Sequence, residues 1–272
     1  MRELPGAQQG DKWHGHKTGR ITASEFNKLT AYSITGLRKT PPVYVELKER
    51  HDYRYRLMIE RQTKQRQRNA YVNPSMEWGI EQEENAKLMF EKSMAKMILP
   101  VGFVLHPTLN CSGASPDGIV DDAVFEVKCP ESKTFEEWWD EEGVPEEHQL
   151  QMQWQMACCE LKRGIFMAYD PRLAEGHRCF FRDIERDDAK IAWLESEVLK
   201  MDAEIEAMLK KRGLPPTEWV IEDGELALPS KYAPESKLNR QLRESMEALD
   251  ADPNDFSGAG YAFLDDNLAG VP

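Results

Sequence analysis

Apolar residues recur with a helical period in some stretches and with a period of two in others, which predicts a mixed α/β chain. The longest helical stretch runs from residue 188 to residue 211. Its apolar stripe has spacings of three and four residues and consists of Ile191, Leu194, Val198, Met201, Ile205 and Met208. Such a stripe indicates a helix that packs on its own domain, and a coiled-coil seam is the alternative that the spacing leaves open.

The same periodicities predict the remaining elements. Helices are expected over residues 23–31, 43–62, 77–92 and 145–161. The first of these begins with Thr22-Ala23-Ser24-Glu25, which has the T-x-x-E form of a capping box. A loop is expected over residues 32–42, and strands are expected over residues 97–105, 119–120, 124–129, 164–169 and 179–184. We therefore expect a central mixed sheet flanked by helices.

The last part of the chain has a different character. Residues 213–272 hold six of the 16 prolines, and residues 222–272 hold 11 acidic against four basic residues. One amphipathic face stands out there, formed by Leu238, Leu242, Met246 and Leu249. We interpret this region as an acidic extension that docks on its own body, a neighbouring subunit or a partner protein.

Composition excludes several classes of protein. The chain has 272 residues, of which 40% are hydrophobic and 31% charged, as in an ordinary globular protein. No apolar run reaches the ~20 residues that cross a bilayer, and residues 1–12 lack the apolar core of a signal peptide. The five cysteines form no C-x-x-C pair, so we expect reduced thiols and no zinc finger.

Charge is unevenly distributed along the chain. The net charge is −13, but residues 1–68 contain 15 Lys or Arg against seven Asp or Glu. The densest basic run, residues 50–56, interleaves arginine with tyrosine and is followed by Arg61. Cations neutralise phosphates and aromatic rings can stack on bases, so this run is a candidate DNA contact. A solvated helix face is the equal alternative.

The segment 115–128 carries the clearest chemistry. If Asp121 and Asp122 form a two-residue hairpin turn, Asp117 lies opposite Glu126 on one face of the sheet, and Lys128 lies on that face too. Two opposed carboxylates repel each other unless something compensates them. A divalent cation does so, and Mg²⁺ prefers a few carboxylates together with water and phosphate. An ordinary surface hairpin is the alternative.

At these motifs the chain resembles the PD-(D/E)xK nuclease superfamily, and within it the phage lambda exonuclease-like (YqaJ-type) viral recombinase family. The resemblance extends from about Gly10 to Gly213. The matching segments are Trp13-His14, Gly19-Arg20-Ile21-Thr22-Ala23-Ser24, Trp78-Gly79 with Glu83 and Ala86, Gly113-Ala114-Ser115-Pro116-Asp117-Gly118, Glu126-Val127-Lys128-Cys129-Pro130, Gln151-Met152-Gln153 and Tyr169-Asp170-Pro171-Arg172. It implies a nuclease domain over residues 1–212 with a restriction-endonuclease-like core at about residues 75–185.

The resemblance also assigns roles to the residues of the core. It implies a Mg²⁺-dependent 5′-to-3′ exonuclease with two metal ions, for which Mn²⁺ is a possible substitute. Asp117, Glu126 and the backbone carbonyl of Val127 would bind metal, and Lys128 would act on the attacking water. A second ion would be reached by Glu83, an acid that helical spacing places on an apolar stripe, and Gln151 would position the nucleophile.

A pocket for the terminal 5′-phosphate is implied as well. Ser24, in the first turn of its predicted helix, would bind the phosphate together with Lys17 or Arg20 and with Ser115. The family has an arginine where Lys17 stands, and lysine lacks the bidentate fork of arginine. Met76 aligns with an apolar residue that opens the terminal base pair, although ordinary packing is the alternative role.

Partners follow from the same resemblance: the ends of double-stranded DNA, a single-strand annealing protein and two further copies of the chain in a ring-shaped homotrimer, with no membrane. Arg54, Arg56 and Arg61 in the basic N-terminal third would line the DNA channel. The expected location is the cytoplasm of a bacterial host, with the protein encoded by a phage or prophage. A RecB-like or restriction-type nuclease and a catalytically idle DNA-binding assembly subunit are the rival interpretations.

Overall fold

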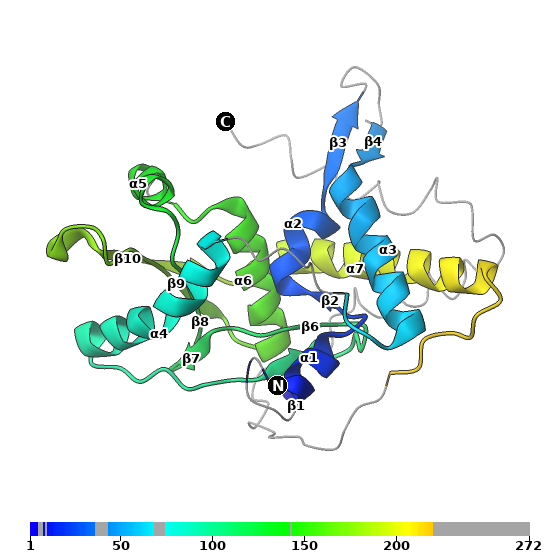
Figure 1. Cartoon of the computed structure of the whole chain (residues 1–272), viewed down its shortest axis with the longest axis horizontal. Coiled ribbons are helices and arrows are strands. Elements are labelled where there is room, and N and C mark those ends of the chain that lie inside the picture. The colour runs from blue at the N-terminus through cyan, green and yellow to red at the C-terminus, as the bar shows by residue number, and fades with distance from the viewer. Residues whose placement is uncertain (5–7, 9, 36–42, 68–73, 142, 220–272) are drawn as a thin grey trace.

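Two mixed four-stranded sheets form the centre of the computed structural model, which describes residues 1–4, 8, 10–35, 43–67, 74–141 and 143–219 (Figure 1). The first sheet has the order β1-β5-β6-β2 and consists of β1 (Arg2–Leu4), β2 (Ile21–Thr22), β5 (Phe103–Leu105) and β6 (Ser112–Ala114). The second has the order β10-β9-β8-β7 and consists of β7 (Gly118–Val120), β8 (Ala123–Lys128), β9 (Arg163–Tyr169) and β10 (Cys179–Glu185). The expected single central sheet is thus divided in two.

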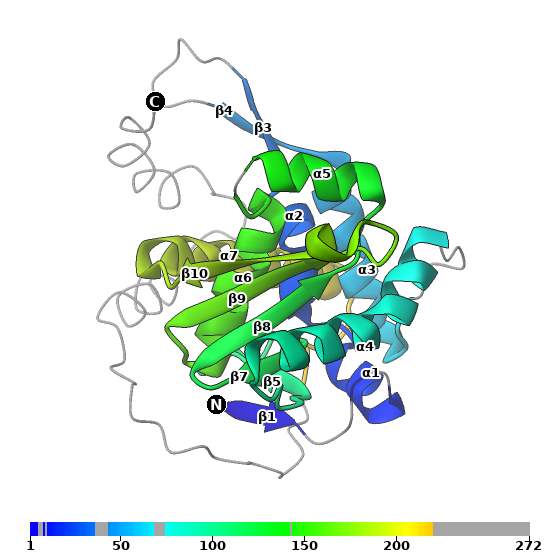
Figure 2. The same ribbon diagram turned by 90° about the vertical axis from the view of Figure 1, so that its left-hand side faces the viewer.

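Helices cover both faces of the second sheet. The helices of the described chain are α1 (Asp11–Lys17), α2 (Phe26–Leu29), α3 (Lys48–Thr63), α4 (Pro74–Met94), α5 (Ser132–Asp140), α6 (Glu146–Cys159) and α7 (Asp188–Lys211). Short 3₁₀ turns occupy Ala23–Glu25 and Glu175–His177. In Figure 2, α4 lies in front of β8 and α6 lies behind it, and both helices contact this strand.

Burial on both sides explains the apolar sequence of β8. Phe125 and Val127 face α4 and pack in one cluster with Phe90. Val124 belongs to the larger core cluster on the side of α6. Because strand residues alternate between faces, Glu126 also points to the α6 side. A carboxylate is thereby placed inside an otherwise apolar layer, where it requires polar partners.

The expectation for α7 is confirmed, bounds included. Ile191, Leu194, Val198, Met201 and Ile205 are almost completely buried in the core of this chain. The helix packs along α3 and α6, so its stripe is used within the domain and is not a free coiled-coil seam. The amphipathic residues Leu238, Leu242, Met246 and Leu249 lie outside the described part of the chain.

The N-terminal third differs from expectation. The predicted loop contains β3 (Tyr32–Thr35), which pairs antiparallel with β4 (Val43–Glu46), and the helix predicted from residue 43 begins at Lys48. Val43, Tyr44 and Val45 have strong strand propensity, which the helical pattern of the following residues concealed. The capping box is wrong too, because Thr22 makes no side-chain cap and Glu25 pairs with Lys28 and Arg56.

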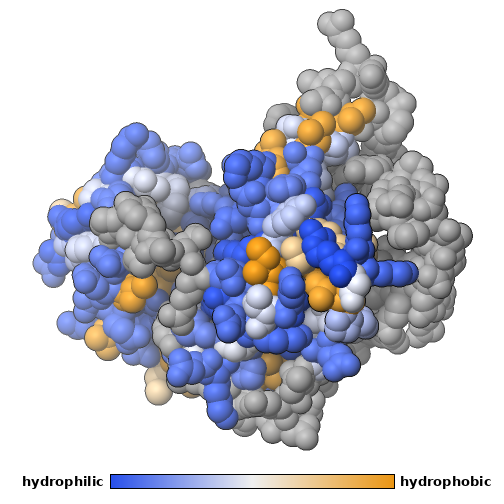
Figure 3. All heavy atoms as spheres, turned by 45° about the vertical axis from the view of Figure 1, so that its right-hand side comes forward, coloured by the Kyte–Doolittle hydropathy of each residue, from blue (hydrophilic) through white to orange (hydrophobic). Residues whose placement is uncertain are grey.

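The β3–β4 hairpin projects from the body and carries apolar side chains (Figure 3). Ile34, Val43 and Val45 are 49%, 44% and 44% exposed. All five cysteines are free thiols, as expected. In the described residues no helix is long and apolar enough to span a membrane.

Candidate active site

The hairpin that carries the two acids has the predicted register. Gly118, Ile119 and Val120 pair with Phe125, Val124 and Ala123, and Asp121 adopts the left-handed conformation that the tight turn requires (φ 53°). The backbone N–H of Asp117 donates to the carbonyl of Phe125 (3.0 Å). The backbone N–H of Val127 in turn donates to the Asp117 carboxylate (2.7 Å). Asp117 is thereby fixed beside the C-terminal half of β8.

Glu126 lies in the middle of a polar network although it is only 1% exposed. One carboxylate oxygen accepts hydrogen bonds from Lys128 and from the amide of Gln151 (2.5 Å). The other oxygen accepts from the amide of Gln155 (2.6 Å). Gln151 and Gln155 are four residues apart on α6, so they present their amides from one helix face. This network supplies the partners that a buried carboxylate needs.

The pKa values at the site reflect desolvation and the closeness of the two carboxylates. Desolvation and then the nearby Glu126 carboxylate raise the pKa of Asp117 well above its usual value, although its side chain is only half-buried. For Lys128, desolvation acts to lower the pKa, but Glu126 and Asp117 outweigh it and the pKa is raised. Lys128 is therefore a protonated donor at neutral pH, which agrees with its hydrogen bond to Glu126.

Glu83 approaches the same charges from α4. Its carboxylate is paired with Lys87 one turn later (2.6 Å). The charge of Glu83 acts to raise the pKa of Asp117, and the charge of Asp117 acts to raise the pKa of Lys87. The pKa of Lys87 is raised, because its bond to Glu83 and the field of Glu83 and Asp117 outweigh desolvation. Glu83 thus lies beside the site as expected, with its charge shared by a lysine.

The donor set fits a magnesium ion. Within the described part of the chain, no three His, Cys, Asp or Glu side chains are grouped as metal ligands. Mg²⁺ does not need such a cage, because it uses one or two carboxylates and completes its shell with water and substrate phosphates. Asp117 and Glu126 supply two such carboxylates, and the backbone carbonyl of Val127, next to the last residue of β8, supplies a third oxygen. Desolvation and the Glu126 carboxylate raise the pKa of Asp117, and a cation held by the two acids would offset their repulsion.

Part of the expected phosphate pocket is assembled. Trp13 donates through its indole N–H to the hydroxyl of Ser115 (2.8 Å), and the ammonium of Lys17 lies 3.8 Å from the centre of the same indole. Desolvation and the nearby Arg66 lower the pKa of Lys17 to about 7, against the fields of Glu25, Glu126 and Asp117. Lys17 is therefore within electrostatic reach of the catalytic acids. Ser24, seven residues after Lys17, is exposed. It lies in a 3₁₀ turn of three residues, Ala23–Glu25, which has no strong helix dipole.

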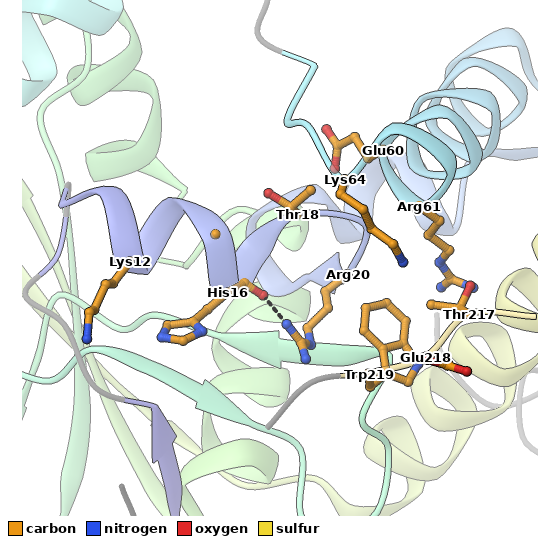
Figure 4. A pocket seen from close by; sticks show the side chains of 11 residues that line it. Lys12, His16, Thr18, Arg20, Glu60, Arg61, Lys64, Thr217, Glu218 and Trp219 are labelled. Atoms are coloured by element: carbon orange, nitrogen blue, oxygen red, sulfur yellow. Dashed lines mark hydrogen bonds between the residues drawn. The ribbon is translucent and has the colours of Figure 1, made fainter. Parts of the chain in front are cut away.

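Arg20 does not join this pocket among the described residues. Arg20 is 5% exposed and donates to the backbone carbonyls of Asn110 (2.8 Å) and His16 (2.6 Å). Its side chain lines a separate cavity together with Lys64 and Trp219 (Figure 4). Met76 belongs to the first turn of α4, and its side chain lies outside the described part of the chain.

The arginines of α3 are held by acids of this chain. Arg61 has a side chain that is 1% exposed and pairs with Asp202 (2.6 Å) and Glu206 (2.9 Å) of α7. Arg54 pairs with Glu204 of α7 (2.6 Å) and with the end of β4. Arg56 pairs with Glu25 (2.9 Å). This placement departs from the expectation of a DNA-facing row, since these three charges already have carboxylate partners.

Sequence reasoning missed four residues that the structure brings to the site: Trp13, Arg66, Lys87 and Gln155. The spacing of Gln151 and Gln155 by one helical turn was available as a signal for the second glutamine. No local pattern indicates that Arg66, which follows α3, lies near Lys17.

Comparisons with known proteins agree with this geometry. A family model for the YqaJ-like viral recombinase domain matches residues 12–162, which is 151 of the 272 residues. An alkaline exonuclease from Laribacter hongkongensis, LHK-Exo, is 31% identical with a TM-score of 0.66, over 75% of this chain and 96% of that chain. Its structure in complex with dAMP gives 31% identity and a TM-score of 0.65, over 75% and 98%.

A phage-related exonuclease from Haemophilus somnus 129PT is 11% identical with a TM-score of 0.54, over 71% of this chain and 96% of that chain, and it shares the fold. No curated protein sequence matches the chain. The fold is the restriction-endonuclease-like α/β fold of these exonucleases. With more than half of its residues matched by the family model, the chain belongs to the YqaJ-like viral recombinase family, whose structural neighbours are lambda-exonuclease-like enzymes.

Proposed function

We propose that this protein is a Mg²⁺-dependent deoxyribonuclease that digests one strand of linear duplex DNA from its 5′ end and leaves 3′ single-stranded overhangs. The observation that carries the proposal is the gathering of Asp117, Glu126 and Lys128 at one end of β8, with Gln151 bonded to Glu126. The 31% identity to an alkaline exonuclease supports the same class of reaction.

Each residue of the site has a stated task in this proposal. Asp117, Glu126 and the carbonyl of Val127 would hold the ion, with Glu83 available to a second one. When bound, magnesium, or manganese in its place, would stabilise negative charge on the phosphodiester oxygens. Lys128 is protonated, so it donates a hydrogen bond and orients the attacking water. Gln151 and Gln155 keep Glu126 in one orientation, which fixes the acceptor geometry.

Selection of the 5′ end rests on Lys17 and Ser115. Both lie around the indole of Trp13, on the side of α1 that is coupled to the catalytic acids. A terminal phosphate placed there would accept hydrogen bonds from the Lys17 ammonium and from nearby hydroxyl groups, including Ser24 at the surface. Arg66 adds a second positive charge close to Lys17.

A digestion assay tests this function. We expect a 5′-phosphorylated linear duplex to be shortened from the 5′-labelled strand end in the presence of Mg²⁺, with closed circles intact and no reaction in EDTA. Asp117→Asn should abolish digestion, and Asp122→Asn, a change in the exposed turn of the same hairpin, should not. Cleavage of closed circles would favour a RecB-like or restriction-type nuclease. No cleavage at all would favour an idle DNA-binding subunit.

The assembly is part of the same proposal. We expect a ring-shaped homotrimer around DNA, and a single-strand annealing protein as partner for the overhang. The exposed apolar hairpin of Ile34, Val43 and Val45 supports an interface with another protein surface, since apolar clusters of this kind are seldom left open. Native mass measured with and without a short duplex tests the trimer, and a monomer in both samples would contradict it.

A further inference from the structure

A cavity of about 310 Å³ is lined by Lys12, Gly15 and His16 of α1, a different set of α1 residues from Trp13 and Lys17 (Figure 4). Its walls come from three segments that are distant in sequence: α1, the end of α3 and the residues after α7. They are Lys12, Gly15, His16, Thr18, Arg20, Glu60, Arg61, Lys64, Thr217, Glu218 and Trp219. The volume is at the lower end of the ~300–1,000 Å³ range of small-ligand sites.

Two cations of this cavity lack a carboxylate partner. Arg20 is buried, and its guanidinium bonds only to backbone carbonyls, with the second terminal nitrogen unpartnered among the described residues. Burial and the neighbouring Arg61 lower its pKa to about 10. Lys64 makes no ion pair within the described ranges. Arg20 is a buried cation with no counter-charge among the described residues, which is costly, and Lys64 adds an exposed positive charge, so this wall favours an anion.

The acids of the cavity are mostly engaged elsewhere. Glu60 accepts the backbone N–H groups of Gly19 (2.8 Å) and Gln67 (3.0 Å). Arg61 is balanced by Asp202 and Glu206, so it adds no net positive charge. Glu60 and the exposed Glu218 are the two negative charges of the lining, against the positive charges of Lys12, Arg20 and Lys64. Arg20 and Lys64 lie beside Trp219, with Lys12 on the far side (Figure 4).

Trp219 gives the cavity an aromatic wall. The guanidinium groups of Arg20 and Arg61 lie 4.6 Å and 4.9 Å from the centre of its indole, which fixes the ring through cation–π contacts. Thr217 anchors the same segment through its hydroxyl, which donates to Glu206 (2.5 Å). The ring is only partly buried. A cavity larger than a phosphate, cationic on one side and aromatic on another, matches a nucleotide.

We infer that this cavity is a second nucleotide site, which takes the phosphate of a deoxynucleotide beside Lys64 and Arg20 and the nucleoside beside Trp219. The choice of a nucleotide among phosphate compounds rests on the proposed function. The two sites share α1: Trp13 and Lys17 face Ser115 and the catalytic acids, whereas Lys12, Gly15 and His16 line the cavity. The nucleotide would come from the free monophosphate pool or from a single-stranded DNA end.

Calorimetric titration of the full chain in EDTA tests the inference, because no hydrolysis is needed. The ligands are dTMP, thymidine, inorganic phosphate and a 5′-phosphorylated hexathymidylate. We expect dTMP to bind. Lys64→Asn should weaken the binding of dTMP about tenfold or more, since a hydrogen bond to a charged group is lost. Asn tolerates the left-handed backbone of residue 64 (φ 57°), so the fold is kept. Trp219→Ala should weaken the binding of dTMP as well.

Two further variants give the inference its controls. Lys210→Asn removes an exposed lysine outside the cavity, and Lys17→Gln removes the lysine on the catalytic side. Lys210→Asn should leave dTMP binding unchanged, and Lys17→Gln should remove only binding at the proposed 5′-phosphate pocket and keep the binding that Lys64→Asn weakens. Tighter binding of the hexathymidylate than of dTMP would identify a DNA strand as the source, and the reverse would identify free nucleotide.

Several results would overturn the inference: no binding of dTMP, equal binding of inorganic phosphate or thymidine, or loss of binding in Lys17→Gln but not in Lys64→Asn. The outcome is independent of the digestion assay with Asp117→Asn, so failure here and failure of the proposed nuclease are distinguishable.

Discussion

The arginine pairs between α3 and α7 allow a prediction whose size follows from the contacts. Arg50 is 1% exposed and donates two hydrogen bonds to Glu204 (2.9 and 3.2 Å) and one to Glu46 (2.7 Å). Arg54 donates to the same two acids (2.6 and 2.9 Å). The change Glu204→Gln keeps the shape of the side chain and removes the charge that both arginines share.

Breaking a buried ion pair on one side costs about 3–5 kcal/mol, because a charge is left uncompensated. Glu46 remains as a second acid, so we expect about 3 kcal/mol, the lower end of that range. For a domain of this size, 1 kcal/mol corresponds to roughly 2–4 °C, which gives a fall in Tm of about 6–12 °C. Thermal unfolding followed by circular dichroism measures it.

The pH dependence provides a second readout. Burial acts to raise the pKa of Glu204, but hydrogen bonds from Arg50 and Arg54 outweigh it and the pKa is lowered from 4.5. An acid with a lowered pKa stabilises the fold above its unfolded pKa and loses that contribution as pH falls through the folded value. The Tm difference between the wild type and Glu204→Gln should therefore shrink at acidic pH below about 4.5.

Asp52→Asn is the matched control, an acid-to-amide change at an exposed position of α3 that should leave Tm almost unchanged. The same reasoning says that Arg54→Ala lowers Tm and leaves the salt dependence of duplex binding intact. If Arg54 contacted DNA, the slope of log K against log salt would flatten by about 0.9. A Tm change below 2 °C in Glu204→Gln, or a flattened slope in Arg54→Ala, would refute the structural role.

Three predictions concern the candidate active site. Asp117→Asn should raise the Tm of the metal-free protein, and the increase should grow above pH 3.8, because an acid with a raised pKa destabilises the fold when it is ionised. The same change should remove the increase in Tm that Mg²⁺ causes, and an unchanged increase would place the ion elsewhere. Preference for 5′-phosphate over 5′-hydroxyl ends should fall as pH rises through about 7, where Lys17 loses its proton, and Lys17→Arg should preserve it; a flat rate ratio would remove Lys17 from the pocket. Gln155→Met should lower kcat roughly tenfold with little change in KM, since Glu126 loses one amide donor, and equal rates would show that Gln151 alone suffices.

The sequence predicted an element correctly wherever one hydrophobic period dominated its segment. The hairpin register around Asp121 and Asp122 follows from alternation and turn length, and the bounds of α7 follow from its stripe. It was insufficient where propensities overlapped, as at Val43–Glu46, where a strand runs into a helix within one residue. Short strands such as Ile21–Thr22 exist only because a distant partner, Ser112–Ala114, lies beside them.

The candidate site was predictable in its acids and less so in its cations. Local alternation places Asp117, Glu126 and Lys128 together, because all three belong to one hairpin. Whether an arginine faces DNA or a carboxylate depends on the position of α7, which lies some 150 residues further along the chain. Local charge counts contain no information on such a partner.

Two sets of cations therefore serve different purposes in a chain of net charge −13. The arginines of α3 are bound by acids of α7 and of the preceding hairpin, so they stabilise the fold and add little to the outer field. The cations coupled to Asp117 and Glu126 or to their neighbour Glu83 come from separate segments and are Lys17, Lys87 and Lys128, and Arg66 lies close to Lys17. A cluster of this kind in a partly desolvated site focuses a positive field on a small region. With a net charge of −13, the rest of the chain would repel DNA, so under the proposed function a duplex end would approach at this site.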